Sequence, residues 1–183
     1  MPTIFSHAIA ATAIGHLFPE RNLPTRFWVL TAICSMLPDT DVIGFALDIR
    51  YNQMLGHRGF SHSILFAVIV SCLIANLAFR DLPLAFNKFA LNIYFFLVTI
   101  SHALLDMMTD GGLGVGLFIP FSAERFFFPW GPIEVSPIGV SFFSSRGLEI
   151  LASEIKWVWL PTVVIIASVW IYRKSMGQQV DEH

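Results

Sequence analysis

The chain has 183 residues, of which 55% are hydrophobic and only 13% are charged, whereas soluble domains carry roughly 25% charged residues. The net charge of −2 lacks the basic excess of nucleic-acid-binding proteins, so we expect no nucleic-acid partner. This composition predicts a single integral membrane domain over residues 1–183, all-α, built as a polytopic membrane bundle of about five helices.

Five apolar segments predict these helices. In chain order they are 2–18, 25–37, 60–79, 88–108 and 155–172. The last three approach the ~20 residues needed to span a bilayer, whereas the first two are shorter. Pro38 is expected to stop the second helix, and Pro161 predicts a kink in the fifth.

Residues 109–153 separate the fourth and fifth segments and are rich in Gly, Pro and Phe. They show no long periodic pattern, so we expect a loop region with short helices. Aromatic side chains partition well into the membrane–water interface. The segment is therefore expected to lie at that interface, where its Phe residues could admit acyl chains.

Polar residues gather where the first four segments begin or end. They are His7 in the first segment, Asp39 and Asp41 in LPDTD, His57, Arg58 and His62 in GHRGFSHS, and His102, Asp106 and Asp110 in SHALLDMMTDGG. If these segments alternate in direction, the start of the first and third and the end of the second and fourth share one membrane face. Connectivity alone therefore predicts that the polar residues converge.

The spacing of His102 and Asp106 places both side chains on one face of a helix. Asp110 continues that line if the helix persists, although Gly111 and Gly112 are expected to end it. Taken alone, such a pair is more often hydrogen-bonded than metal-bound, and LPDTD alone is more often a polar turn.

Taken together, four carboxylates with only Arg58 nearby would repel one another and would be costly to bury at membrane depth without a cation. We therefore expect one or two divalent ions, with Zn²⁺ favoured by the mixed ligands and Mn²⁺ or Fe²⁺ as alternatives. The predicted ligands are His7, Asp39, Asp41, His57, His62, His102, Asp106 and Asp110.

Basic residues predict the orientation, because they are denser in the loops on the cytoplasmic side. The short turns hold Arg21, Arg26, Arg80, Lys88, Arg173 and Lys174. The longer loops beside the polar residues hold Arg50, Arg58, Arg125, Arg146 and Lys156. The turns at 19–26 and 80–88 are therefore expected in the cytoplasm, and the metal site is expected to face the periplasm.

On the motifs SHA, LPDTD, GHRGFSHS, SHALLDMMTDGG and FIPFSAERFFFPW, the chain resembles the YdjM-like family of LexA-regulated inner-membrane metal-dependent hydrolases. The motifs span about residues 5–130, and the resemblance implies a bacterial inner-membrane location and hydrolase activity. A fainter likeness links the predicted ligands to the metal sites of zinc-dependent phospholipase C and P1-type nucleases. The chain lacks their N-terminal Trp and later His ligands, which favours one or two ions over three.

These features predict hydrolysis of a phosphoester in a membrane lipid. Asp39 or Asp110 is expected to serve as general base, and Arg58 and Arg125 to bind phosphate oxygens. Arg125 alternatively snorkels at the interface. Loss of Arg58 would then slow turnover by ~10²–10³ and leave the metal in place. A metal transporter or sensor, or a membrane metallo-amidase or protease without the HExxH motif, is the alternative.

Overall fold

The computed structural model describes residues 1–19, 22–81, 87–137 and 142–180. Its α-helices are α1 (Ile4–Leu17), α2 (Thr25–Met36), α3 (Ile64–Leu73), α4 (Lys88–Met107), α5 (Ser145–Glu154) and α6 (Leu160–Val180). The 3₁₀ segments are η1 (Leu37–Leu47) and η2 (Phe60–His62), and the π-helical segments are η3 (Ile74–Ala78) and η5 (Ile155–Trp159).

Several of these elements follow one another without a break. Helix α2 runs into η1, α3 into η3, and α5 through η5 into α6, so the described residues form five continuous helical segments. Their only β pairings are two isolated bridges, between Thr109 and Ile133 and between Val115 and Phe126. The predicted all-α bundle is therefore confirmed.

Three helical segments are long and apolar enough to cross a membrane. They are Thr25–Leu47, Lys88–Met107 and Ser145–Met176, while Ile4–Leu17 and Ile64–Ala78 are shorter. The sequence placed the third segment among the full-length spans and the second among the short ones. The structure reverses these two assignments, because the second segment continues beyond Pro38.

The second α-helix ends at Met36, just before Pro38 as predicted, but the chain continues as a 3₁₀ helix, which the sequence did not predict. Pro38 occupies the first turn of η1, and the chain stays helical to Leu47. A proline is tolerated there because the first turn of a helix leaves its N–H groups unpaired in any case. Asp39 and Asp41 therefore project from a 3₁₀ helix and not from a loop.

The region 109–153 is also more ordered than predicted at its C-terminal end. Helix α5 already begins at Ser145 and continues through η5 to α6. The π-helical turn Ile155–Trp159 comes just before Pro161, which cannot donate a backbone hydrogen bond. Upstream of α5, exposed aromatic side chains include Phe121, Trp130 and Phe143.

Arg21 and parts of the turns around it and around 82–86 lie outside the described residues.

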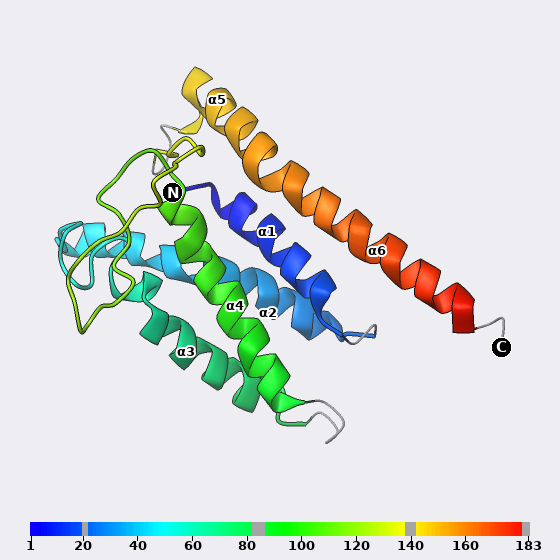
Figure 1. The fold of residues 1–183 in the computed structure, drawn as a ribbon. Helices are drawn as coiled ribbons and strands as arrows, with labels where there is room; N and C mark the ends of the chain where they lie inside the picture. The colour runs from blue at the N-terminus through cyan, green and yellow to red at the C-terminus, as the bar shows by residue number, and fades with distance from the viewer. Residues whose placement is uncertain (20–21, 82–86, 138–141, 181–183) are drawn as a thin grey trace.

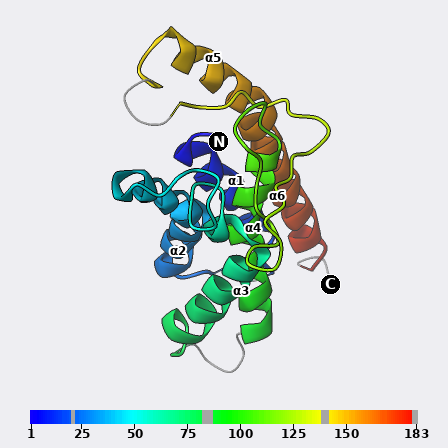
Figure 2. The same cartoon turned by 90° about the vertical axis from the view of Figure 1, so that its left-hand side faces the viewer.

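Helix α4 lies at the centre of the bundle. It packs against α1, α2 and α3, and α6 packs along α1, so that α3 and α6 lie on opposite sides of α4 (Figure 1). The view in Figure 2 shows the long connection after α4 folding over one end of the bundle. Buried aromatic side chains fill the interior towards the other end, among them Phe27, Tyr94 and Phe95.

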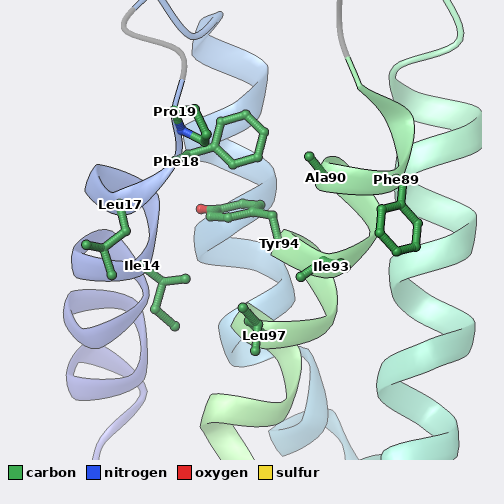
Figure 3. A pocket seen from close by; sticks show the side chains of 9 residues that line it. All are labelled: Ile14, Leu17, Phe18, Pro19, Phe89, Ala90, Ile93, Tyr94 and Leu97. Atoms are coloured by element: carbon green, nitrogen blue, oxygen red, sulfur yellow. The ribbon is translucent and has the colours of Figure 1, made fainter.

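An apolar pocket of about 310 Å³ lies between the end of α1 and the start of α4 (Figure 3). Ile14, Phe18, Phe89 and Leu97 line it, together with Tyr94, whose hydroxyl lies 2.6 Å from the Thr31 hydroxyl. This pocket is at the opposite end of α1 and α4 from the polar residues of the sequence motifs. It offers no metal ligands.

Candidate metal centre

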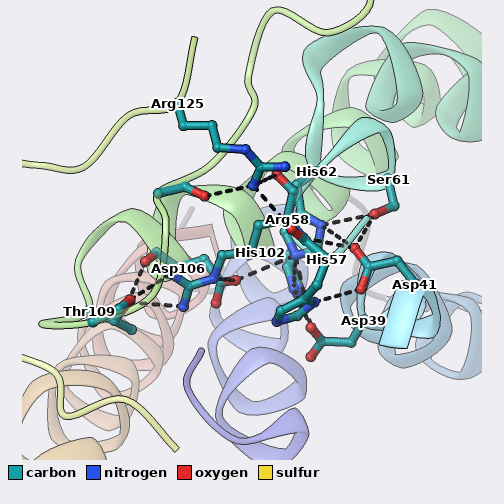
Figure 4. A network of polar contacts seen from close by, with 12 residues as sticks. Asp39, Asp41, His57, Arg58, Ser61, His62, His102, Asp106, Thr109 and Arg125 are labelled. Atoms are coloured by element: carbon teal, nitrogen blue, oxygen red, sulfur yellow. Dashed lines mark hydrogen bonds and ion pairs between the residues drawn. The ribbon is translucent and has the colours of Figure 1, made fainter. Parts of the chain in front are cut away.

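Four buried side chains from three separate parts of the chain meet at one end of the bundle. Asp39 comes from η1, His62 from η2, and His102 and Asp106 from the last turns of α4 (Figure 4). One ligand atom from each lies within 4.8 Å of all the others. The convergence that connectivity predicted is therefore present in the structure.

The distances in this group suit a single metal ion. His102 Nε2 lies 3.1 Å from His62 Nε2 and 3.3 Å from Asp39 Oδ1, and His62 Nε2 lies 3.4 Å from Asp106 Oδ2. Bonds of ~2.0–2.1 Å in a tetrahedron place ligand atoms about 3.3–3.4 Å apart. These three separations match that value, whereas His62 Nε2 lies 3.9 Å from Asp39 Oδ1 and the group as a whole spans up to 4.8 Å, so a bound ion would draw some of the ligand atoms closer together.

The electrostatics of the group also call for a cation. Both oxygens of Asp39 are buried, and no hydrogen bond from the described residues reaches either of them. The buried carboxylates of Asp39 and Asp106 face the imidazoles of His102 and His62, so a cation among them would offset the cost of burying the negative charges. The residues present therefore fit a divalent ion.

Outer hydrogen bonds turn the two imidazoles towards the centre. His102 Nδ1 donates to the backbone carbonyl of Ser35 at 2.7 Å. His62 Nδ1 lies 2.9 Å from the Ser61 hydroxyl and 3.1 Å from Asp41 Oδ2. In both residues Nε2 is therefore the nitrogen that faces the centre, an arrangement that metal-binding histidines commonly show.

Asp41 and His57 lie one layer outside the four ligands. Asp41 accepts hydrogen bonds from His57 Nδ1 at 2.6 Å, from the Arg58 backbone N–H at 3.0 Å and from the Ser61 hydroxyl at 2.6 Å. Both carboxylate oxygens are thus engaged, so the structure places Asp41 as an orienting group and not with the ligand atoms. His57 stacks edge-on against Tyr51 and is held by Asp41.

His7 lies directly against the four-residue group. Its ring stacks on His102 with 3.6 Å between centroids, and its Nε2 is 3.6 Å from Asp106 Oδ1. The ring is buried, and neither nitrogen has a hydrogen-bond partner among the described residues. His7 is therefore placed to bind a second ion with the outer oxygen of Asp106.

Arg58 has a different position from the one expected of a phosphate-binding residue. It is fully buried, with Nε 2.9 Å from Asp106 Oδ2, and it donates to the Gly111 carbonyl at 2.9 Å and the Thr109 hydroxyl at 3.0 Å. Its guanidinium group is thus occupied in fixing Asp106 and the chain after α4. This corrects the expectation that Arg58 contacts substrate.

The Gly111-Gly112 pair serves this arrangement and does not end the helix, because α4 already ends at Met107. Gly112 has φ +94°, and a Cβ added there would lie 2.9 Å from Arg58 Nη1 and 2.8 Å from the Tyr51 hydroxyl oxygen. A side chain at this position would displace the guanidinium group. The glycine therefore lets the loop close over Arg58.

Arg125 also has partners other than a substrate. Its guanidinium group donates to the backbone carbonyls of His57 at 3.1 Å and Tyr51 at 3.0 Å, and more weakly to those of Gln53 and Gly114. Arg125 therefore ties the loop after α4 to the loop before α3. This replaces both the phosphate-binding and the snorkelling interpretation.

Asp110 does not join the cluster. Since α4 ends before it, the line of side chains from His102 through Asp106 is broken, and Asp110 is exposed. Its Oδ1 accepts a hydrogen bond from the Val135 backbone N–H at 2.8 Å. Asp110 is thus separate from the four-residue group in the structure.

Sequence reasoning missed Glu154, which anchors the start of α1. The buried carboxylate accepts hydrogen bonds from the Thr3 backbone N–H, and from the hydroxyls of Thr3 and Ser6 at 2.6 Å each. Trp159 Nε1 donates to the same Ser6 hydroxyl at 2.8 Å. An anion is favoured at a helix N-terminus. The signal available was a lone acidic residue directly before the fifth apolar segment.

We expect Glu154→Ala to lower the free energy of unfolding by several kcal/mol, because it leaves three buried donors without an acceptor at ~1–3 kcal/mol each. Thermal unfolding in detergent measures this. Glu149→Ala is the matched control: Glu149 is exposed and pairs with Arg146 at the surface, so it should change stability by less than ~1 kcal/mol. Equal melting temperatures for the two variants would contradict the anchoring role.

Comparison with known proteins agrees with these features. The sequence profile of the YdjM inner membrane protein family matches residues 1–178. The Escherichia coli (strain K12) protein "Inner membrane protein YbcI" is 37% identical over 177 residues, which cover 95% of this chain and 100% of that protein. No solved structure matches the chain. The predicted location in the bacterial inner membrane is confirmed, and the chain belongs to the YdjM inner membrane protein family.

Proposed function

We propose that this protein is a metal-dependent hydrolase that cleaves a phosphoester of a membrane lipid at the outer face of the inner membrane. The observation that carries the proposal is the buried Asp39, His62, His102 and Asp106 group, whose ligand atoms lie within 4.8 Å of one another. A divalent cation held by His62, His102 and Asp106 would keep one position open for water beside Asp39, and it would supply Lewis acidity and activate that water near neutral pH. The mixed His and Asp ligands favour Zn²⁺.

Asp39 is the proposed general base. Its Oδ1 faces the histidine pair, while Oδ2 accepts no hydrogen bond from the described residues and is free to take a proton. Asp106 is held by Arg58 and cannot move, so it suits a purely ligating role. His7 and the outer oxygen of Asp106 would serve a second ion if one binds.

The proposal that the cleaved bond is a phosphoester rests on the likeness of the ligand set to those of zinc phospholipases. The lipid substrate is supported by the position of the group at one end of the apolar helices and by the exposed aromatic residues beside it. A transporter is less well supported, because His62, His102 and Asp106 lie at or near helix ends, although Asp39 lies within the segment Thr25–Leu47, and transporters bind their ions near the bilayer midplane.

Reconstitution in lipid tests the activity. Zn²⁺- or Mn²⁺-loaded protein should release a phosphate-containing product from at least one phospholipid or isoprenoid phosphate, and a chelator should abolish the release. Asp39→Asn should lower turnover per bound ion by about 10²–10⁴, the usual contribution of a general base. Asp110→Asn is the matched carboxylate control and should retain turnover. Activity that survives chelation would contradict the proposal.

The proposed orientation has its own test. Asn52 is exposed in the loop before α3, and Arg80 is exposed beyond the other end of that helical segment. In a Cys72→Ser background, a cysteine at Asn52 should react with an impermeant reagent in intact spheroplasts, and a cysteine at Arg80 only after lysis. The reverse pattern would place the metal centre at the cytoplasmic face.

A further inference from the structure

A second cavity, of about 260 Å³, opens beside the candidate metal centre. Its lining includes the start of α1, part of η1 and the chain just before α5, with the side chains of Ile4, Phe5, Asp39, Val42, Phe142 and Phe143. Met1, Pro2, Thr3, Ser136 and Pro137 also line it, so the wall carries a few polar groups besides Asp39. The cavity is therefore mainly apolar, and Asp39 is the carboxylate in its wall.

That carboxylate belongs to the metal centre. Asp39 is only 5% exposed, and its Oδ1 lies 3.3 Å from His102 Nε2. Neither of its buried oxygens accepts a hydrogen bond from the residues that the structure describes. A molecule in the cavity would therefore have its apolar part against the walls and its reactive end at the ligands.

The cavity is accessible from the apolar side of the membrane interface. Phe5 and Phe143 are 60% and 86% exposed, although both also line the cavity. Aromatic rings so exposed on a membrane protein sit well in the interfacial layer of lipid. An occupant can thus enter from the bilayer without crossing water.

The volume limits the occupant to one chain. At roughly 30 Å³ for each water-sized group, a value that also suits a methylene, 260 Å³ accommodates about nine such groups. That is a single alkyl or isoprenoid chain of medium length, and the two chains of a diacyl lipid do not fit.

We propose that this cavity binds the chain of a single-chain lipid phosphate and delivers its phosphoester end to Asp39 and the metal centre. The proposal rests on the proposed hydrolase function and narrows its substrate class. On this proposal the cavity holds one chain, and single-chain lipid phosphates fit it best because they have no second chain to place outside it.

Photolabelling tests the binding site without relying on turnover. Zn²⁺-loaded protein is irradiated with a diazirine-bearing dodecyl phosphate, and labelled residues are mapped by mass spectrometry. We expect label on Phe5, Val42 and Phe143 above the background at Phe121, which is 85% exposed and lies elsewhere. Excess dodecyl phosphate should remove this label, and an equal amount of diacyl phosphatidic acid should not.

Two neighbouring substitutions sharpen the test. Val42→Trp fills the cavity, so labelling of Phe5 and Phe143 should fall about tenfold, as loss of two buried methylene groups predicts. Ile43→Trp adds the same side chain at an adjacent residue that is 61% exposed and does not line the cavity, and it should change nothing. Zinc content should be equal in both.

The outcomes separate the two proposals. Specific labelling of the cavity without hydrolysis of any lipid would retain the chain-binding site and overturn the hydrolase function. Hydrolysis that Val42→Trp leaves intact, or labelling that diacyl phosphatidic acid removes equally well, would overturn the single-chain site and retain the hydrolase.

Discussion

His102→Ala is expected to abolish stoichiometric metal binding. His102 contributes Nε2 to the four-residue group and is fully buried, so its loss removes one of the four ligand atoms from a site that water does not readily enter. Loss of an outer hydrogen-bond partner typically weakens metal affinity ~10–100-fold, and loss of a ligand should exceed that range. Elemental analysis of purified protein and a zinc competition titration would measure both effects.

Two further substitutions, with smaller expected effects on metal affinity, serve as controls for this prediction. Asp41→Asn should weaken affinity only about 10–100-fold, because Asp41 orients His62 without lying among the four ligand atoms. His16→Ala should have no effect, since His16 lies at the far end of α1, where it packs beside Trp28 and contacts the Thr12 carbonyl. Equal zinc content in all three variants would contradict the ligand assignment.

Arg58→Met is expected to destabilise the whole protein and not merely slow a reaction. The substitution retains much of the side-chain volume but leaves Asp106 without its buried guanidinium partner. Removing one partner of a buried ion pair costs about 3–5 kcal/mol. The melting temperature in detergent should fall accordingly, and zinc content should fall with it because Asp106 loses its fixed position.

Arg50→Met is the control, because Arg50 is an exposed arginine in the same connection and should tolerate the change. Another result would support the substrate-binding role that the sequence predicted for Arg58. If Arg58→Met keeps both stability and zinc content but lowers turnover by ~10²–10³, then Arg58 stabilises the transition state.

The sequence predicted which side chains of α4 lie together at the candidate centre, because their spacing acts within one helix. His102 and Asp106 are four residues apart, and any regular helix places them on the same face. The meeting of η1, η2 and the end of α4 was also predictable, since alternating directions bring those ends together. Local periodicity and connectivity were sufficient for this part of the site.

The different positions of Asp39, among the four candidate ligands, and Asp41, outside them, could not be predicted from spacing and connectivity. It depends on η1 being a 3₁₀ helix, in which successive residues are ~120° apart, so side chains two apart point to different faces. The sequence suggested a loop after Pro38, for which no such rule applies. Only the helical geometry directs Asp39 to His102 and Asp41 to His57.

Arg58 and Glu154 were misjudged or missed because their partners are distant in sequence. Arg58 and Asp106 are 48 positions apart in the sequence, and Glu154 and Thr3 are 151 positions apart. A charged residue near a membrane face has many possible partners, and composition does not select among them. The partner of Glu154 is determined by the packing of α1 beside η5 and α6.

The bond between Thr3 and Glu154 also sets an order of events during synthesis. Chains emerge N-terminus first, so α1 and its His7 enter the membrane long before the carboxylate that fixes their position has been made. Until α5 arrives, the first turn of α1 lacks its acceptor, and the ring of His7 lacks a fixed support against His102. The nascent chain therefore carries a loosely assembled centre, and the finished geometry, with whatever metal selectivity it confers, is acquired only as the last helical segment is inserted.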